Sequence, residues 1–370
     1  MKMKSILFSA LLMMSASAAK SQSVVFPVVY HVLYFNAQQN LPDSVLQHQL
    51  DVLTEDFNAT NPDIVNVPAV WQPLIGDMNI DFQLATVDPQ GNPTTGIERR
   101  QVSSSTITQA VAHSFANGGL DPWPDSLYLN IWVYGMPTGP LALTAFPDNN
   151  PNTLQYLDLT WRVVGRNDPN NVAPYNKGRT ATHEMGHFFG LYHIWGDDGG
   201  ACTGTDYIAD TPNQADETYG NPGVGTVITD MCTPSAPGIM WQNYMDFTDD
   251  AGMCFFTIGQ TVRVDTVLAW YYPSFLGPAG IRTVNENHSQ YTVFPSPSAT
   301  GIFQVNRTDY STCASVEVYD LQGRMMLAPE YFGNGSTTMQ IDLSAFANGT
   351  YSVVIRTETA TETQRVVIAR

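Results

Sequence analysis

Residues 183–193 read His-Glu-Met-Gly-His-Phe-Phe-Gly-Leu-Tyr-His. On a helix, His183 and His187 lie one turn apart on the same face, so both imidazoles can bind one metal ion. Gly190 can adopt the left-handed backbone conformation that ends a helix, and the turn brings His193 round as a third ligand. Three protein ligands leave one position of a tetrahedral zinc ion open, which is typical of a catalytic site.

Glu184 is the candidate catalytic base of this predicted site. It follows His183 on the edge of the same helix face, where its carboxylate can reach the attacking water without binding the metal. The pattern predicts hydrolysis of peptide bonds, in which zinc polarises the scissile carbonyl and Glu184 carries a proton from the water to the leaving amine. Three of the seven histidines fall in this stretch, so a helix with ordinary surface histidines is a poor alternative.

A second motif lies further along the chain, where residues 243–247 read Asn-Tyr-Met-Asp-Phe. An internal methionine is most often a core residue. Downstream of a zinc motif, however, Met245 is predicted to form the apolar floor under the three imidazoles. The extended histidine motif followed by such a methionine turn is the signature of the metzincins, a class of zinc endopeptidases.

Beyond these motifs, the chain resembles the pappalysin family of metzincins, specifically its short cytophagalysin-like branch, over about residues 24–270. The resemblance implies an α+β metzincin (zincin-like) catalytic domain with a twisted mixed sheet, two long helices, and a cleft between an upper and a lower subdomain. It also implies a secreted zinc-dependent endopeptidase that cuts protein or peptide substrates. The matching stretches outside the zinc motif are residues 26–32, 92–97, 129–133, 178–182, 210–212 and 243–250.

The resemblance further places a calcium site in the loop after the zinc motif. Its ligands would be the side chains of Asp198, Asp206 and Thr211 and the backbone carbonyl of Ala209. Calcium prefers oxygen ligands of this kind, and a long loop without periodicity needs some means of staying ordered. The alternative is that these aspartates only cap turns and remain solvated.

Four cysteines occur in the chain, and in an exported protein they allow three complete disulfide pairings. The sequence alone does not choose among these pairings. The resemblance implies a disulfide between Cys202 and Cys232, which would close the same loop. Cys254 and Cys313 could pair with each other, but we expect both to be free thiols.

Phe247 departs from the family pattern, which usually has a tyrosine two residues after the methionine of the turn. A phenyl ring can neither bind zinc nor donate a hydrogen bond. We therefore expect an active enzyme with weaker stabilisation of the transition state. The alternative is a secreted protein that binds zinc but is catalytically impaired, and the retained Glu184 favours the enzyme.

The N-terminus predicts export from the cytoplasm. Lys2 and Lys4 precede a short apolar run at residues 6–14 and small residues at 16–18, so residues 1–19 are predicted to be a removed signal peptide. Neither this run nor a later one is long enough to cross a membrane, which predicts a secreted or cell-surface protein without an integral membrane segment. The net charge of −18 disfavours nucleic acid as a partner.

The C-terminal part of the chain has a different pattern. Short β-rich runs separated by turn residues predict a small all-β Ig-like sandwich over residues 289–370. This part is similar to the sorting domain of type IX secretion, which implies the type IX secretion machinery as a partner. An Ig-like accessory or carbohydrate-binding module is the alternative. The stretches that carry the similarity are residues 294–297, 318–324, 349–351 and 366–370.

Apolar periodicity predicts the elements of the catalytic domain, which we place at residues 20–276, before a linker at 277–288. Residues 141–146 are expected to form an edge strand to which an extended substrate could add. Asp249 and Asp250 could line the pocket for the residue after the cut and favour Arg or Lys there, although exposed loop carboxylates are the simpler interpretation. The predicted strands are 24–34, 78–84, 127–134 and 141–146, and the predicted helices begin at residue 42 and span 180–191 and 258–268.

Overall fold

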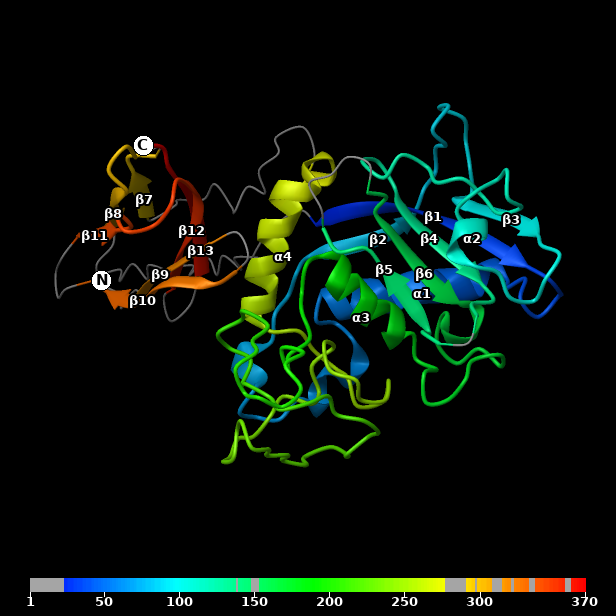
Figure 1. Cartoon of the computed structure of the whole chain (residues 1–370), viewed down its shortest axis with the longest axis horizontal. Helices are drawn as coiled ribbons and strands as arrows, with labels where there is room; N and C mark the ends of the chain where they lie inside the picture. Colours follow the sequence, from blue (N-terminus) through cyan, green and yellow to red (C-terminus); the bar gives the residue numbers. More distant parts are fainter. Residues whose placement is uncertain are drawn as a thin grey trace, which may run out of the picture.

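The chain folds into a larger part with a mixed sheet and helices, up to residue 276, and a smaller all-β tail from residue 291 (Figure 1). The predicted signal peptide, the predicted linker and Cys313 lie outside the described residues, so the domain boundaries remain predictions. The structure is a computed structural model that describes residues 23–137, 139–147, 153–276, 291–296, 298–307, 315–320, 323–332, 337–356 and 361–370.

A six-stranded mixed sheet is the frame of the larger part. Its strands pair in parallel except β5, which is antiparallel to β6 and forms one edge. β1 lies inside the sheet, and its side chains are almost all buried, as expected of a strand covered on both faces. The strand order is β2 (Ile80–Leu84), β1 (Val24–Tyr34), β4 (Leu129–Tyr134), β6 (Tyr156–Thr160) and β5 (Ala142–Thr144), with β3 (Ile97–Gln101) also paired to β1.

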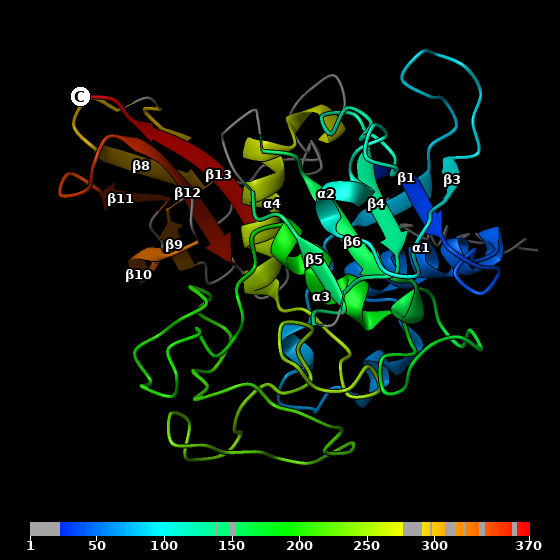
Figure 2. The ribbon, with the colours of Figure 1, turned by 45° about the vertical axis from the view of Figure 1, so that its right-hand side comes forward.

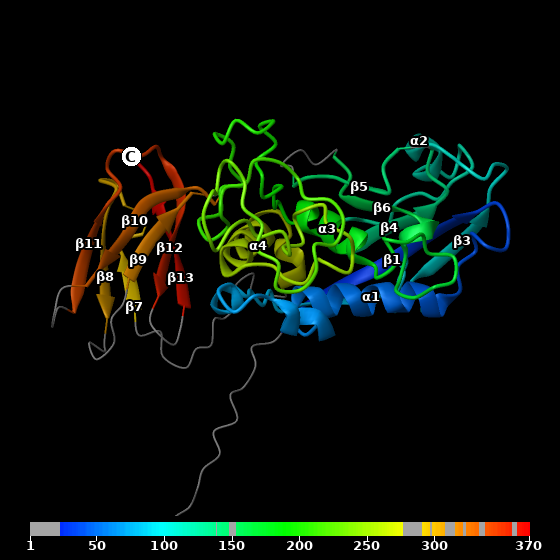
Figure 3. The same ribbon diagram turned by 90° about the horizontal axis from the view of Figure 1, so that it is seen from below.

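Three helices contribute to the main core with one set of β1 side chains. α1 runs along this face of the sheet (Figure 3) and buries residues at helical spacing, among them Leu46, Leu50 and Leu53. A second, smaller cluster around Trp132 covers the opposite face. The helices are α1 (Asp43–Phe57), α2 (Gln109–Ala112), α3 (Arg179–Phe188) and α4 (Ile258–Tyr271), with short 3-10 turns at Pro62–Asn66, Gln72–Leu74, Trp161–Val163 and Pro273–Leu276.

Most elements predicted from periodicity are present, but three differ in extent and some strands were not predicted. α3 ends at Phe188 instead of continuing to residue 191, because Gly190 already has a left-handed φ of +79°. The closing helix α4 continues to Tyr271, and it begins with a capping box formed by Thr257 and Gln260. The edge strand β5 is shorter than predicted. Strands β3 and β6 were not predicted, and β3 in particular reads Ile-Glu-Arg-Arg-Gln, without an apolar alternation.

The segment between α3 and α4, green to yellow in Figure 2, forms a lobe of loops below the sheet. The predicted Cys202–Cys232 disulfide is confirmed: the two Cα atoms lie 5.3 Å apart, and the cysteines are 30 residues apart in sequence. Cys254 is a buried free thiol, also as expected. The covalent link therefore closes a loop that contains little regular structure to hold it.

Replacing both Cys202 and Cys232 by serine is expected to lower the free energy of unfolding by roughly 3–4 kcal/mol, because the unfolded chain regains the entropy of an open loop of this length. Urea titrations of the zinc-loaded protein would measure the loss. The matched control is Cys254→Ser, which removes a thiol without opening a loop. Equal midpoints for the wild-type protein and the double variant would contradict the expectation.

The tail is a sandwich of two antiparallel sheets, which agrees with the predicted Ig-like architecture. Its core consists of alternating residues such as Phe303, Val305, Val316, Val318 and Val353. Nowhere in the described part of the chain does a helix have both the length and the apolar character needed to span a membrane. One sheet has the order β10 (Met325–Tyr331), β9 (Ser315–Tyr319), β12 (Gly349–Arg356) and β13 (Thr361–Ile368), and the other has β11 (Thr338–Asp342), β8 (Ile302–Arg307) and β7 (Tyr291–Phe294).

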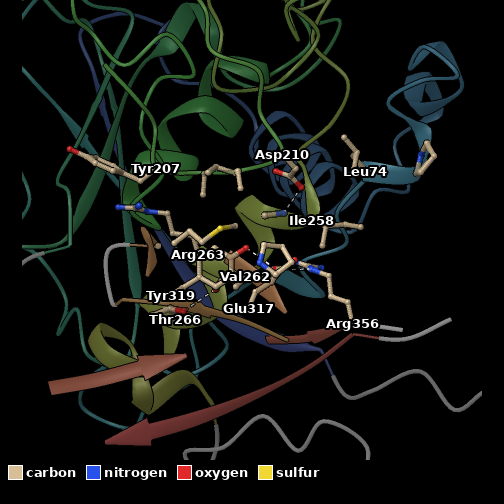
Figure 4. A pocket seen from close by; sticks show the side chains of 17 residues that line it. Leu74, Tyr207, Asp210, Ile258, Val262, Arg263, Thr266, Glu317, Tyr319 and Arg356 are labelled. Carbon is tan, nitrogen blue, oxygen red and sulfur yellow. Dashed lines mark hydrogen bonds and ion pairs between the residues drawn. The ribbon is translucent and has the colours of Figure 1, made fainter. Parts of the chain in front are cut away.

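The tail meets the larger part at α4. The Arg365 guanidinium lies 5.4 Å from the centre of the Trp270 ring. A cavity of about 730 Å³ lies at this junction, lined from one side by Asp210 and Arg263 and from the other by Glu317 and others (Figure 4). This cavity is larger than the one beside the histidines described below, but it contains none of the predicted zinc ligands, so its size does not make it the active site.

Candidate metal centre

The helix that carries the first two histidines is bounded by glycines. α3 starts directly after Gly178, which has a φ of +80°. Gly190 reverses the chain toward His193, and a Cβ atom there would lie 3.0 Å from a methyl group of Val267 in α4. Gly190 therefore provides both the backbone conformation and the space that the turn requires.

The three predicted histidines meet at one point. The Nε2 atom of His187 lies 3.1 Å from the Nε2 atom of His183 and 3.0 Å from that of His193. Among the residues that the structure describes, they are the one group of three or more His, Cys, Asp or Glu side chains that gathers its ligand atoms this closely.

Each of these rings uses its other nitrogen, Nδ1, in a hydrogen bond to an oxygen atom that can only accept. The proton of each neutral ring is therefore assigned to Nδ1, and each Nε2 atom presents a lone pair to the common point. The pairs are His183 Nδ1 with the carbonyl of Tyr244 at 2.7 Å, His187 Nδ1 with the carbonyl of Leu191 at 2.8 Å, and His193 Nδ1 with the carboxylate of Asp197 at 2.8 Å.

This arrangement fits a zinc ion. Around a tetrahedral ion with bonds of about 2.0–2.1 Å, ligand nitrogens are expected about 3.3 Å apart, close to the spacings observed here. Burial lowers the pKa of His187 to about 4 and the pKa of His183 well below its usual value. Both rings are therefore neutral at physiological pH, as metal ligands must be. Three nitrogen lone pairs that converge in this way fit a bound cation.

Glu184 lies beside the histidines and is not a member of the ligand group. It lines a cavity of about 330 Å³ together with His183, Phe247 and other residues. Burial raises the pKa of its carboxyl group to about 7. A carboxylate with this basicity, next to an open coordination position, is suited to take a proton from water near neutral pH.

Met245 lies where the sequence analysis expected it, against the ligand helix. It is fully buried, and a Cβ atom on Gly186 would overlap its sulfur atom. The turn is held by Asn243, whose side chain accepts a hydrogen bond from the amide of Met245 at 2.9 Å. Two further hydrogen bonds join Asn243 to Gln260 of α4. The closing helix α4 therefore helps to hold Met245 in position beneath the histidines.

The cavity beside Glu184 also contains aromatic side chains. The ring of Phe247 has its centre 5.3 Å from that of His183 and 4.9 Å from that of His193, so it packs directly on two ligands. Tyr175 and Tyr219 line the same cavity. Neither tyrosine was predicted from the sequence as a site residue, because neither lies within a recognisable motif.

Arg179 is a third residue of this region that was not predicted from the sequence to have a role. It is the first residue of α3 and is almost fully buried, with its guanidinium paired to Asp56 and Asp63. A signal was present in the sequence, because a basic side chain is unfavourable at the positive end of a helix and so indicates a nearby carboxylate.

The predicted calcium ligands are brought together only in part. The hydroxyl of Thr211 donates to Asp206 at 2.7 Å, and both side chains are buried. Asp198 instead accepts hydrogen bonds from its own loop, and the amide of Gly204 is the main cause of its lowered pKa. Burial raises the pKa of Asp206 to about 7. Ala209 lines the cavity at the junction with the tail.

The two aspartates after the methionine turn differ in position. Asp250 lines the cavity beside Glu184, whereas Asp249 is not part of its lining. The Asp250 carboxylate accepts hydrogen bonds from the amides of Lys177 at 2.7 Å and Arg179 at 3.3 Å, and burial raises its pKa to about 6. It is a buried, positioned acid, not an exposed loop carboxylate.

Comparison with known proteins gives relatives for both parts of the chain. Residues 121–269 match the family model described as pregnancy-associated plasma protein-A, and residues 292–369 match the one described as secretion system C-terminal sorting domain. An extracellular metalloprotease of Verticillium alfalfae is 32% identical over 254 residues, which are 67% of this chain and 78% of the relative. One of Arthroderma otae is 27% identical over 250 residues, or 67% and 79%.

A solved structure is also similar. Mature mirolysin of Tannerella forsythia, in complex with a cleaved peptide, is 43% identical, with a TM-score of 0.64 over 67% of this chain and 93% of that chain. Fold, histidine triad and relatives together define a zinc metalloendopeptidase that is secreted or exposed at the cell surface. The chain belongs to the pappalysin family of metzincins and has a type IX secretion sorting domain as its tail.

Proposed function

We propose that the protein hydrolyses peptide bonds with His183, His187 and His193 as zinc ligands and Glu184 as general base. The observation that carries this proposal is the convergence of three imidazole Nε2 atoms beside a cavity that also contains a buried carboxyl group. Met245 supports the ligand helix from below.

Zinc, when bound by the three Nε2 atoms, supplies a Lewis acid that polarises the scissile carbonyl and acidifies the attacking water. Glu184 takes a proton from this water as the oxygen attacks the carbonyl carbon, and then delivers the proton to the amide nitrogen that leaves. The hydrogen bonds from Nδ1 hold the ligand rings in orientation throughout. The ring of Phe247 packs against two of the ligands but offers no hydrogen bond to the developing oxyanion.

Digestion of casein by the mature protein tests this proposal. Cleavage is expected to stop when a zinc chelator is added and to return when zinc is restored in slight excess. Cleavage that survives complete removal of zinc would show that the metal centre is not the catalytic site. A protein that binds one equivalent of zinc but never cleaves casein or a peptide mixture would instead support the catalytically impaired alternative.

We further propose that substrates align along β5 and place a basic side chain near Asp250. β5 is an edge strand, so its outer backbone groups can pair with an extended peptide. Peptides cut from a proteome digest and identified by mass spectrometry are expected to show Arg or Lys directly after the cut. Asp250→Asn is expected to lower this preference by roughly 10-fold, since one charge pair in a buried pocket contributes about 1–3 kcal/mol. Asp249→Asn is the matched control, and an unchanged profile in Asp250→Asn would contradict the assignment.

The loop after the zinc motif is proposed to hold calcium through Asp206, Thr211 and the carbonyl of Ala209, with Asp198 as a further ligand. Asp206 supports this proposal because a buried carboxylate is costly to ionise without a nearby cation. Asp198 would have to exchange loop amides for the ion, since its oxygens already accept hydrogen bonds from them.

Stability without calcium is expected to fall with rising pH. The folded-state pKa of Asp206 is about 7, above its usual value of 3.8, so the folded state binds the proton more tightly than the unfolded state does. The stability that this proton contributes is lost as the pH rises from 3.8 to about 7. The loss between about pH 5 and pH 8 is roughly 2–3 kcal/mol. Added calcium should reverse this trend by favouring the ionised carboxylate.

Urea titrations in zinc-containing buffer, with and without calcium, would measure both effects. Asp206→Asn is the control, because residue 206 then cannot titrate: the variant should lose the response to calcium and the part of the pH trend that Asp206 contributes. A wild-type protein whose midpoint does not respond to calcium at about pH 8 would show that the loop has no calcium site and that the aspartates only cap turns.

We propose that residues 1–19 direct export and are removed, that residues 20–276 form the catalytic domain, and that residues 277–288 link it to a sorting sandwich at residues 289–370. The sandwich would bring the protein to the type IX secretion machinery. The match to the sorting-domain family over residues 292–369 supports this role. Mass spectrometry of the secreted protein would locate both ends of the mature chain.

A further inference from the structure

A buried charged cluster lies behind the first zinc ligand and takes no part in the chemistry proposed above. It consists of Asp56 at the end of α1, Arg179 at the start of α3, and Tyr244, the residue before the methionine of the turn. The exposed fractions of their side chains are 0%, 5% and, for Tyr244 as a residue, 0%. None of the three lines the cavity that contains Glu184.

Asp56 connects to His183 along two separate routes. One carboxylate oxygen accepts a hydrogen bond from the hydroxyl of Tyr244 at 3.0 Å, and the backbone carbonyl of Tyr244 accepts from His183 Nδ1 at 2.7 Å. The other oxygen accepts from the hydroxyl of Thr182 at 2.6 Å, and Thr182 directly precedes His183 in α3. A single side chain of α1 therefore contacts both the residue beside the ligand and the residue that holds its ring.

Arg179 fixes the direction of these hydrogen bonds. Its Nε atom lies 3.0 Å from the second oxygen of Asp56, and an Nη1 group donates to the hydroxyl oxygen of Tyr244 at 3.1 Å. Because the tyrosine oxygen receives this hydrogen, its own proton is directed to Asp56. The same Nη1 atom also donates to the carbonyl of Met253 at 2.9 Å, which ties the chain beyond the methionine turn to the cluster.

The other two ligands have hydrogen-bond partners that are near in sequence, so local chain geometry holds them. The partner of His187 is Leu191, in the turn that follows its own helix, and the partner of His193 is Asp197, four residues further on. The partner of His183 is 61 residues away in sequence. The carbonyl of Tyr244 stays in place only if contacts other than local chain geometry hold the methionine turn against α3.

Stability alone does not account for buried charges at this position. Burying an ion pair costs much of its Coulomb energy in desolvation, and apolar side chains of similar volume often stabilise a core equally well. What an ion pair with hydrogen-bonded neighbours adds is fixed direction, which metal ligands require from the groups around them.

We propose that Asp56 and Arg179 are positioning residues for the metal centre, acting through Thr182 and Tyr244 to hold His183 with its Nε2 atom directed at the ion. The inference rests on the proposed zinc site. If the wild-type protein bound no zinc, this result would contradict the proposed zinc site itself and not the positioning role of Asp56 and Arg179.

Tyr244→Phe tests this inference, because it removes one hydroxyl and keeps the ring and the carbonyl that holds His183. The zinc dissociation constant, measured by competition with a chelator, is expected to rise by about 10- to 100-fold. The visible absorption bands of the cobalt-substituted protein should shift, and kcat should fall while KM changes less than about twofold.

The matched control is Tyr30→Phe. Tyr30 is equally buried, and its hydroxyl donates to the carbonyl of Leu46 at 3.2 Å in the core, away from the metal centre. Tyr30→Phe loses one buried hydrogen bond and Tyr244→Phe loses two, so Tyr244→Phe should show the larger loss in melting temperature. Only Tyr244→Phe should change the zinc affinity and the cobalt spectrum.

Thr182 provides a second, independent test in case Tyr244→Phe does not fold. Thr182→Val removes the hydroxyl that donates to Asp56 and should weaken zinc binding, whereas Thr182→Ser keeps the hydroxyl and should restore it. If Tyr244→Phe and Thr182→Val both bind zinc within about twofold of the wild type and give its cobalt spectrum, the cluster serves only the fold and the inference is wrong.

Discussion

Glu184→Gln is expected to lower kcat by about 10³- to 10⁴-fold, the upper part of the range for the loss of a general acid–base group. Glutamine has nearly the same shape but cannot take a proton from the attacking water. Burial raises the pKa of the wild-type carboxyl group, which suits it both to take a proton from the water and to release it to the leaving amine. The loss should therefore appear in kcat, with KM changed far less.

The decisive accompanying measurement is zinc content, because Glu184 is not one of the three ligands. Atomic absorption should give one zinc per chain in both the wild type and the variant, and circular dichroism should be unchanged. Glu98→Gln is a matched control: Glu98 also contacts a histidine, His31, at 2.9 Å, but lies outside the metal centre. Casein cleavage by Glu184→Gln at more than a tenth of the wild-type rate would rule out the proposed base.

The ligand set could be predicted from the sequence because it is encoded locally. His183, His187 and His193 lie within one helix and its terminal turn, so spacing alone brings them together. The same holds for β1, whose continuous apolar run indicates a strand buried on both faces. The methionine turn needed more than spacing, since only the upstream motif distinguishes Met245 from an ordinary core methionine.

The supporting structure around the ligands could not be predicted in the same way. The groups that fix His183 and His187 are backbone carbonyls, which every residue carries and no sequence pattern reveals. Asp56 and Arg179 are 123 positions apart by their residue numbers, and their pairing depends on how α1 packs on α3. Strand β3 was missed for a related reason: it pairs through its backbone while its charged side chains remain half-exposed.

Gly186→Ala is expected to lower kcat/KM at least about 100-fold, because a displacement of the ligand helix by even about 1 Å can have that effect. Gly186 lies in α3 between the two histidines, and an added Cβ atom would overlap the sulfur of Met245 and lie 3.2 Å from its methyl group. Met245 is fully buried, so its side chain, the turn or the helix must shift to make room. Overpacking of this kind costs about 1–3 kcal/mol of stability.

The double variant Gly186→Ala, Met245→Val separates this clash from any intrinsic effect of alanine. Valine is shorter than methionine and removes both atoms that the new Cβ would meet, so the double variant should recover most of the zinc affinity and at least about 10-fold in kcat/KM over Gly186→Ala. Alanine favours a helix more than glycine does, so without the clash the substitution would stabilise α3. If Gly186→Ala is as active as the wild type, Met245 does not pack against the ligand helix in solution, and the floor assigned to the metal centre is wrong.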